Sequence, residues 1–166
     1  MSQHLVPDIL EILAAGQDMA VATTLPDGAP HVVTVSFASE GLALYFGCSP
    51  ASQKARNLDR DDRIAISVTL PYRDWSQIRG LSLGGRARPV AQGEAQVRVA
   101  ALFAAKFSEI AQYVPDMGDE MALFEVVPEV VGVLDYGKGF GHVEHVRVTA
   151  RDPIRTTRLA PATGAA

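Results

Sequence analysis

Cysteine is nearly absent from the sequence. Cys48 is the single cysteine among 166 residues, so no disulfide can form within one chain. A reducing, cytoplasmic setting is therefore expected. The histidines match no zinc-ligand spacing with cysteine or acidic partners, so no metal site is expected; they are His4, His31, His142 and His145.

A basic excess and long apolar runs are missing as well. The chain has 15 Lys and Arg against 19 Asp and Glu, for a formal net charge of −4. Surfaces that bind nucleic acid or anionic membranes need a clustered basic excess, so neither partner is expected. No stretch approaches the about 20 apolar residues of a membrane-spanning helix. The N-terminus has no basic segment followed by a long apolar run, so no signal peptide is expected.

The remaining composition is that of an ordinary globular protein, with 48% apolar and 20% charged residues. Helical spacing predicts helices over 6–15, 52–60 and 94–107, with 108–114 as an extension of the last. Apolar patterns and turn residues predict strands over 19–24, 31–38, 42–47, 63–70, 78–90, 122–127, 130–135 and 142–148.

The order of these elements predicts the fold class. Short turns join most strands, and strands and helices do not alternate regularly. This favours a mainly β fold, a closed or split antiparallel β-barrel with a few helices, over a Rossmann-type sheet. The first three strands are expected to form an antiparallel meander, and the Gly84-Gly85 pair marks an expected bulge or barrel corner. Residues 1–150 are predicted to form one domain, and 151–166 a polar C-terminal tail.

The segment 42–58 carries the first candidate site. An apolar strand runs into a turn of small residues and then into a short basic helix. This order places free backbone N–H groups, the Ser52 hydroxyl and the Lys54 ammonium at one helix N-terminus, which attracts an anion such as phosphate. The alternative is a capped surface helix with solvated Lys54 and Arg56, and on spacing alone this alternative is the commoner one.

The segment 134–142 carries the second candidate site. It contains Gly137, Gly139 and Gly141, and glycine allows the backbone to approach a ligand closely. One interpretation is a loop that presents Phe140 and His142 to a cofactor or substrate; the other is a glycine-rich hairpin. No helix follows, so the segment is not a dinucleotide-binding fingerprint.

Several segments also occur in an order that is more specific than any one of them; they are 27–37, 44–47, 52–58, 62–68 and 85–87. Together they resemble the pyridoxamine 5'-phosphate oxidase-like family of flavin-binding split barrels, over roughly 19–148. The resemblance implies a homodimer that binds FMN at the subunit interface. By matched position it implies that Ser52 and Lys54 hold the phosphate and that further residues contact the cofactor, namely Val33, Thr34, Val35, Gly47, Cys48, Gln53, Arg79 and Gly80, with Phe140 added from the glycine-rich segment.

The expected activity is an FMN-dependent oxidoreductase reaction on an unidentified small substrate. His142 is the best candidate acid or base, because imidazole exchanges protons near neutral pH. The substrate motif Arg-x-His of the family's best-known enzyme is missing, so pyridoxamine phosphate is not expected as the substrate. The alternatives are a flavin or heme carrier without turnover, and a deazaflavin-dependent reductase. Trp75 is expected either at the dimer interface or as a cap on the barrel.

Overall fold

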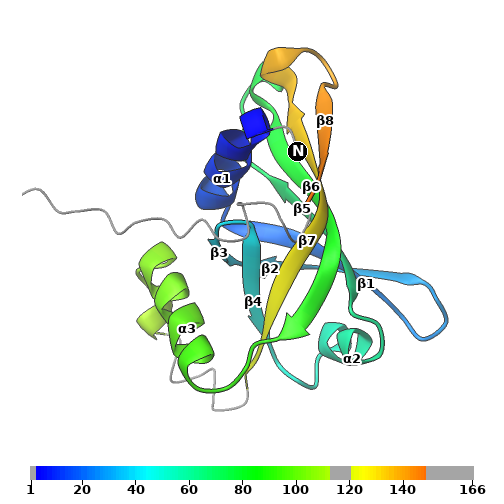
Figure 1. Cartoon of the computed structure of the whole chain (residues 1–166), viewed down its shortest axis with the longest axis vertical. Coiled ribbons are helices and arrows are strands. Elements are labelled where there is room, and N and C mark those ends of the chain that lie inside the picture. Colours follow the sequence, from blue (N-terminus) through cyan, green and yellow to red (C-terminus); the bar gives the residue numbers. More distant parts are fainter. Residues whose placement is uncertain (1–2, 113–120, 149–166) are drawn as a thin grey trace, which may run out of the picture.

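A single antiparallel sheet dominates the computed structural model, which describes residues 3–112 and 121–148 (Figure 1). The predicted tail at 151–166 and the end of the predicted extension at 113–114 lie outside these residues. The strands are β1 (Asp18–Thr24), β2 (Pro30–Ser36), β3 (Ala38–Glu40), β4 (Ala43–Cys48), β5 (Arg63–Thr69), β6 (Arg79–Pro89), β7 (Ala122–Asp135) and β8 (Val143–Arg147).

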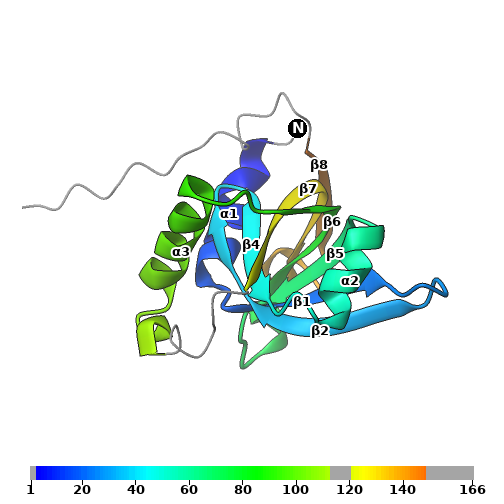
Figure 2. The same cartoon turned by 90° about the horizontal axis from the view of Figure 1, so that it is seen from below.

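Three α-helices and short 3-10 turns accompany the sheet. The helices are α1 (Val6–Ala15), α2 (Gln53–Arg60) and α3 (Glu94–Lys106), and the turns are η1 (Gln3–Leu5), η2 (Trp75–Gln77), η3 (Ile110–Gln112) and η4 (Tyr136–Lys138). All three predicted helices are confirmed, and the predicted extension contains the turn η3. Figure 2 shows α2 and α3 on opposite sides of the barrel. Within the described ranges, no helix combines the length and the apolar character that a membrane crossing requires.

The strand order makes the sheet close on itself. The order is β2-β1-β5-β6-β7-β4-β3, with β8 added beside β7. The two outermost strands, β2 and β3, are separated along the chain only by Phe37, so the sheet must curl to bring its ends together. Phe37 is fully buried and its N–H donates to the carbonyl of Gln17. The result is a split antiparallel barrel, and the predicted fold class is confirmed.

The alternation of apolar and polar residues explains which side of each strand faces the core. Strand β5 alternates strictly, with Ile64, Ile66 and Val68 buried and the residues between them exposed. Such alternation is typical of a sheet with one solvated face. Helix α1 closes one end of the core with its buried residues Ile9, Ile12 and Leu13.

The predicted meander of the first three strands is wrong. Strand β2 pairs with β1, whereas β4 pairs with β3 and β7, and no pairing joins β2 to β4 in the described sheet. The predicted strand over 31–38 instead ends at Ser36, because the buried Phe37 turns the chain toward the opposite edge of the sheet.

The predicted break between the last strands is also wrong. Pro128 lies inside the continuous strand β7, although proline cannot donate a hydrogen bond to a neighbouring strand. The pairing register shifts at this position, where Gly84 pairs with Val130 and Gly85 pairs with Pro128, so that Glu129 is the extra residue of a β-bulge. The bulge predicted from the glycine pair is thus confirmed, and it is what makes the proline tolerable.

Candidate functional site

The N-terminus of α2 has the features of an anion-binding site. Ser52 adopts an extended backbone conformation, and its hydroxyl accepts a hydrogen bond from the N–H of Ala55 over 3.4 Å. The N–H groups of Gln53 and Lys54 lie in the first turn, where no intrahelical acceptor is available. Lys54 is half-buried and makes no hydrogen bond or ion pair within the described residues. One cation and several free donors therefore converge at this helix end.

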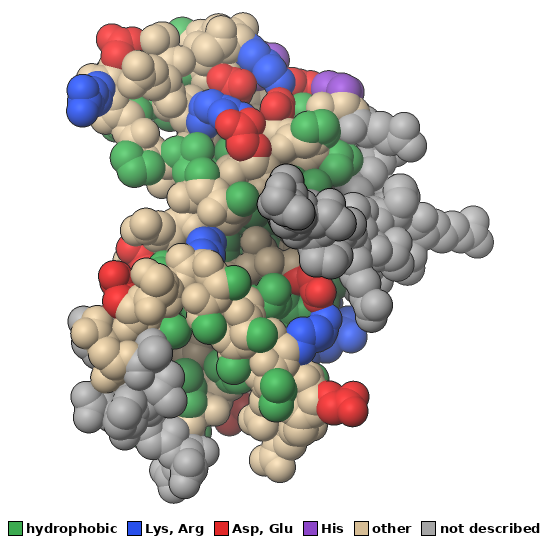
Figure 3. Space-filling view, turned by 90° about the vertical axis from the view of Figure 1, so that its left-hand side faces the viewer, with side chains coloured by type: hydrophobic (Ala, Val, Ile, Leu, Met, Phe, Trp, Pro, Cys, Tyr) green, Lys and Arg blue, Asp and Glu red, His purple; other side chains and the backbone are tan. Residues whose placement is uncertain are grey.

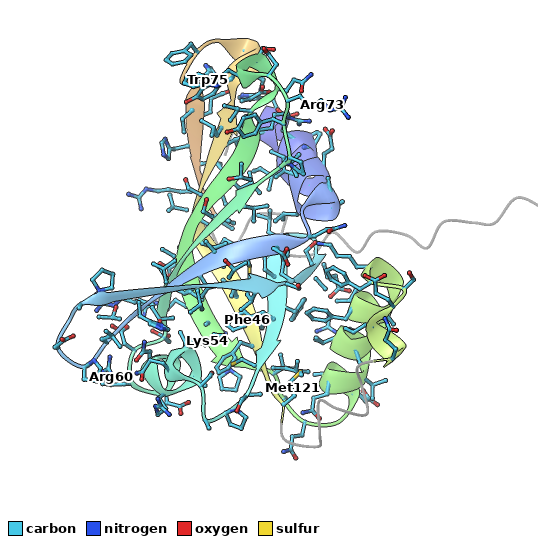
Figure 4. All side chains as sticks on the ribbon, turned by 180° about the vertical axis from the view of Figure 1, so that it is seen from behind. Phe46, Lys54, Arg60, Arg73, Trp75 and Met121 are labelled. Carbon is cyan, nitrogen blue, oxygen red and sulfur yellow. The ribbon has the colours of Figure 1, made fainter. Side chains whose placement is uncertain are left out.

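Two further predicted residues lie at the end of β4, just before the loop that leads to α2. Gly47 lies close to Met121, and a Cβ atom added to Gly47 would come within 2.6 Å of the Met121 sulfur. Cys48 is 8% exposed. Figure 4 shows Phe46, Lys54 and Met121 at this same end of the molecule. Gly47, Cys48 and the start of α2 are therefore neighbouring elements of one region, which we call the α2 end.

Strand β2 carries three further predicted residues, Val33, Thr34 and Val35. Val33 and Val35 pack against the core, and Thr34 between them is exposed. Strand β2 pairs with β1 on one side, and no other strand of the described sheet pairs with its second edge. Such an edge offers backbone N–H and C=O groups to a ligand.

Arg79, Gly80, Phe140 and His142 lie at the opposite end of the barrel, which we call the tip. Strand β6 begins at Arg79, and eight residues later the N–H of Ala87 donates to Asp62, just beyond the end of α2. At about 3.3 Å per residue this separation is about 25 Å. Figure 4 shows Trp75 at the tip and Lys54 at the α2 end. One chain thus divides the predicted residues into two distant groups.

Arg79 is held at the tip by carboxylates. Its guanidinium donates to both carboxylate oxygens of Glu11 over 2.9 and 3.1 Å, and it lies 3.8 Å from Asp8. The hydrogen bond from Arg79 lowers the pKa of Glu11. Lys138 joins this group of charged side chains, because its ammonium lies 2.9 Å from Asp8. Figure 3 shows acidic, basic and histidine side chains gathered at the end that carries α1.

His142 is held by a carboxylate. Its Nε2 lies 3.0 Å from Oε1 of Glu144, and His4 lies 3.1 Å from the other oxygen. These two contacts, with His142 the stronger influence, lower the pKa of Glu144 to about 2. Glu144 thus orients the His142 ring. Because His142 is half-exposed, the ring also remains accessible. Such an imidazole can transfer protons to or from a bound molecule.

Exposed aromatic rings cover the tip. Phe140 and Trp75 stack with their ring centroids 5.7 Å apart and their planes 8° apart, and the Tyr136 ring lies 5.3 Å from Phe140. Phe140 is 79% exposed and Trp75 63% exposed. Trp75 therefore lies on the surface and does not cap the barrel. Surface aromatic rings in contact are typical of a binding or interaction site.

The sequence reasoning missed the buried support beneath α2. Asn57 is fully buried and donates from its amide to the hydroxyl of Thr23, which is 3% exposed. The side chain of Gln53, a residue predicted to contact a cofactor, donates to Asn57 and accepts from Arg56. Gln53 and Asn57 are four residues apart and share a helix face. That spacing was the available signal, but it does not reveal a partner on another strand.

The architecture defines the class of protein as a split antiparallel β-barrel. The family model described as pyridoxamine 5'-phosphate oxidase matches residues 5–135, and the chain belongs to this family. No curated protein matches the sequence.

Solved structures of the same fold include bacterial proteins of different names. A conserved hypothetical protein from Mycobacterium tuberculosis is 25% identical with a TM-score of 0.70, and the match covers 91% of this chain and 94% of that one. A heme-binding protein from Mycobacterium smegmatis is 20% identical with a TM-score of 0.70, and the match covers 82% of this chain but only 55% of that one. The heme storage protein from Vibrio cholerae is 22% identical with a TM-score of 0.64, and the match covers 75% and 90%.

Proposed function

We propose that this protein is a homodimeric flavoprotein that binds FMN and acts as an oxidoreductase on a small substrate. The observation that carries the proposal is the N-terminus of α2, where the Ser52 cap, free backbone N–H groups and the unpaired Lys54 ammonium converge among the described residues. This donor set suits a phosphate group, which accepts several hydrogen bonds and carries negative charge. Family membership supports the assignment of that phosphate to a flavin.

Each part of the α2 end would have its own role. Ser52 and Lys54 would hold the phosphate, and the free edge of β2 from Val33 to Val35 would lie along the flavin ring. Gly47 and Cys48, at the end of β4, would lie beside the flavin ring or its ribityl chain. Bound FMN would supply hydride or electron transfer.

A second copy of the chain would complete the site. The tip lies about 25 Å along β6 from Ala87, which bonds to Asp62 beside α2, so one cofactor would not reach both groups of predicted residues on the same chain. In a homodimer, the tip of one protomer would reach the α2 end of its partner. Arg79, Gly80 and Phe140 would then border the flavin, and the partly exposed imidazole of His142 would hold or release a proton.

A flavin titration tests this proposal. Trp75 is the only tryptophan, so its emission reports events at the tip without interference from other tryptophans. We expect the protein to bind FMN and the emission of Trp75 to fall on binding, because the tip of one protomer lies near the flavin of its partner. A protein that takes up no added FMN would refute the proposal.

Replacement of Lys54 tests the phosphate site directly. Lys54→Ala is expected to weaken FMN binding by about 1.5–3 kcal/mol, the range for a hydrogen bond to a charged group. Flavin fluorescence measures the affinity, and Arg98→Ala on α3 is a control that also removes one positive charge, at a guanidinium that already pairs with Glu40. An unchanged affinity of Lys54→Ala would exclude this side chain from the site.

Heme binding is the second candidate. It is favoured by the two heme proteins among the similar structures and by the accessible His142 imidazole, a group that can coordinate heme iron. A Soret band after addition of hemin, lost in His142→Ala, would support this alternative. Uptake of a deazaflavin in preference to FMN would instead favour a deazaflavin-dependent reductase.

A further inference from the structure

A line of hydrogen bonds runs from β1 through α2 to the loop before it. Asn57 Nδ2 donates to Thr23 Oγ1 over 2.9 Å, and Gln53 Nε2 donates to Asn57 Oδ1 over 2.8 Å. Arg56 Nη2 donates to Gln53 Oε1 over 2.9 Å, and Arg56 Nη1 donates to the carbonyl of Ala51 over 2.5 Å. Because Asn57 is fully buried and Thr23 nearly so, the inner end of this line has no access to water.

The guanidinium of Arg56 fixes the direction of every bond in the line. A guanidinium donates hydrogen bonds and cannot accept them, so the Gln53 atom that faces it must be the amide oxygen. The Gln53 nitrogen then faces Asn57, which must accept through its own oxygen and donate through its nitrogen to Thr23. Both side-chain amides are therefore held in one orientation, and neither can turn without loss of a bond.

This line also fixes the rotation of α2 about its own axis. Gln53 and Asn57 lie on the stripe that faces β1, and Ala55 and Leu58 lie in the core. Successive helical residues are about 100° apart, so a rotation by one residue would carry Asn57 out of its buried position and turn Lys54 away from its present direction. The Arg56 bond to Ala51 extends the same restraint to the loop directly before Ser52.

We infer that Asn57 is a positioning residue for the phosphate end of the site and that the side chain of Gln53 supports Asn57 instead of contacting the cofactor; this inference rests on the proposed function. The line of bonds holds the Ser52 hydroxyl, the first-turn N–H groups and the Lys54 ammonium in one arrangement, ready for a phosphate. Such preorganisation increases affinity because binding then orders fewer groups.

The comparison of FMN with riboflavin, which lacks the phosphate, tests this role. Thr23→Val preserves the shape of the side chain but removes the acceptor of Asn57, whereas Thr23→Ser keeps the hydroxyl. We expect Thr23→Val to weaken FMN binding about three- to tenfold, as the loss of one hydrogen bond allows, with riboflavin binding unchanged. Thr23→Ser is expected to retain the wild-type preference for FMN. A general loss of stability would instead weaken the binding of FMN and of riboflavin alike.

Gln53→Met provides the decisive variant if Thr23→Val fails to fold, because Gln53 is only half-buried. Gln53→Met should reduce the preference for FMN over riboflavin, as Thr23→Val does. Gln96→Met on α3 should leave that preference unchanged. If the wild type binds no FMN, the proposed function itself fails. If Lys54→Ala abolishes the preference for FMN but Gln53→Met and Thr23→Val retain it, the proposed function stands and the inference about Asn57 is overturned.

Discussion

At the scale of single residues, the surroundings of a charged group decide its role more than its type does. The sequence has three lysines, Lys54, Lys106 and Lys138, whose side chains are chemically the same. The structure leaves Lys54 half-buried without a described partner, pairs Lys138 with Asp8, and places Lys106 over an aromatic ring. Only the first arrangement leaves a cation available to a ligand anion.

Lys106 gives a prediction about pH. Its ammonium lies 3.8 Å from the centre of the buried Phe37 ring and donates to the carbonyl of Leu13 over 3.1 Å. Burial lowers the pKa of Lys106 from 10.5 to about 8 in the folded protein. Between these two values the unfolded chain binds more protons, so this group makes the fold more stable as the pH rises from about 8 toward 10.5.

The measurement is a comparison with Lys106→Met across this pH range. We expect the free energy of unfolding of the wild type, taken relative to that of Lys106→Met, to increase between pH 8 and pH 10.5. Urea unfolding at several pH values gives both free energies, and the subtraction removes the other titrating groups. A difference between the two proteins that is constant with pH would contradict the prediction.

At the scale of secondary structure, the sequence was a good guide to elements and a poor guide to their partners. The alternation in 63–69 and the helical spacing in 94–106 are local patterns, and both elements form as predicted. The pairing of β4 with β7 and the hydrogen bond between Asn57 and Thr23 join distant segments, and no local pattern contains them. Pro128 was misread as a break because the bulge that accommodates it depends on the neighbouring strand.

The bulge between β6 and β7 gives a prediction about stability. A Cβ atom at Gly85 would lie 2.3 Å from the carbonyl oxygen of Val127 and 2.9 Å from Cα of Pro128, both of which are backbone atoms. Gly85→Ala is therefore expected to lower the free energy of unfolding by about 1–3 kcal/mol, the usual cost of overpacking. Urea unfolding measures the change.

The neighbouring glycine provides the matched control. A Cβ atom at Gly84 would lie 3.3 Å from a methyl group of Val130, and a side chain can move where a backbone cannot. Gly84→Ala should therefore cost clearly less than Gly85→Ala. Equal costs would contradict the prediction, because the loss could then not be assigned to the contact of the new Cβ atom with the Val127 and Pro128 backbone.

At the scale of the whole molecule, the question is whether one site draws on two chains. Phe140 stacks on Trp75, which lies at the tip and far from Lys54 (Figure 4), so Lys54 and Phe140 of the same chain would belong to different sites of a homodimer. Lys54→Ala and Phe140→Ala homodimers should then each carry two impaired sites. In a mixed dimer, the two defects fall together in one site, and the other site is built from an intact α2 end and an intact tip.

Mixing the two variants therefore gives the final prediction. After subunit exchange, part of the Lys54→Ala and Phe140→Ala mixture should bind FMN with wild-type affinity, up to one site in each mixed dimer. Flavin titration before and after exchange measures this recovery, and light scattering verifies that dimers are present. If each site were built within a single chain, every site in the mixture would keep its own defect, and the titration after exchange would equal the average of the two separate variants.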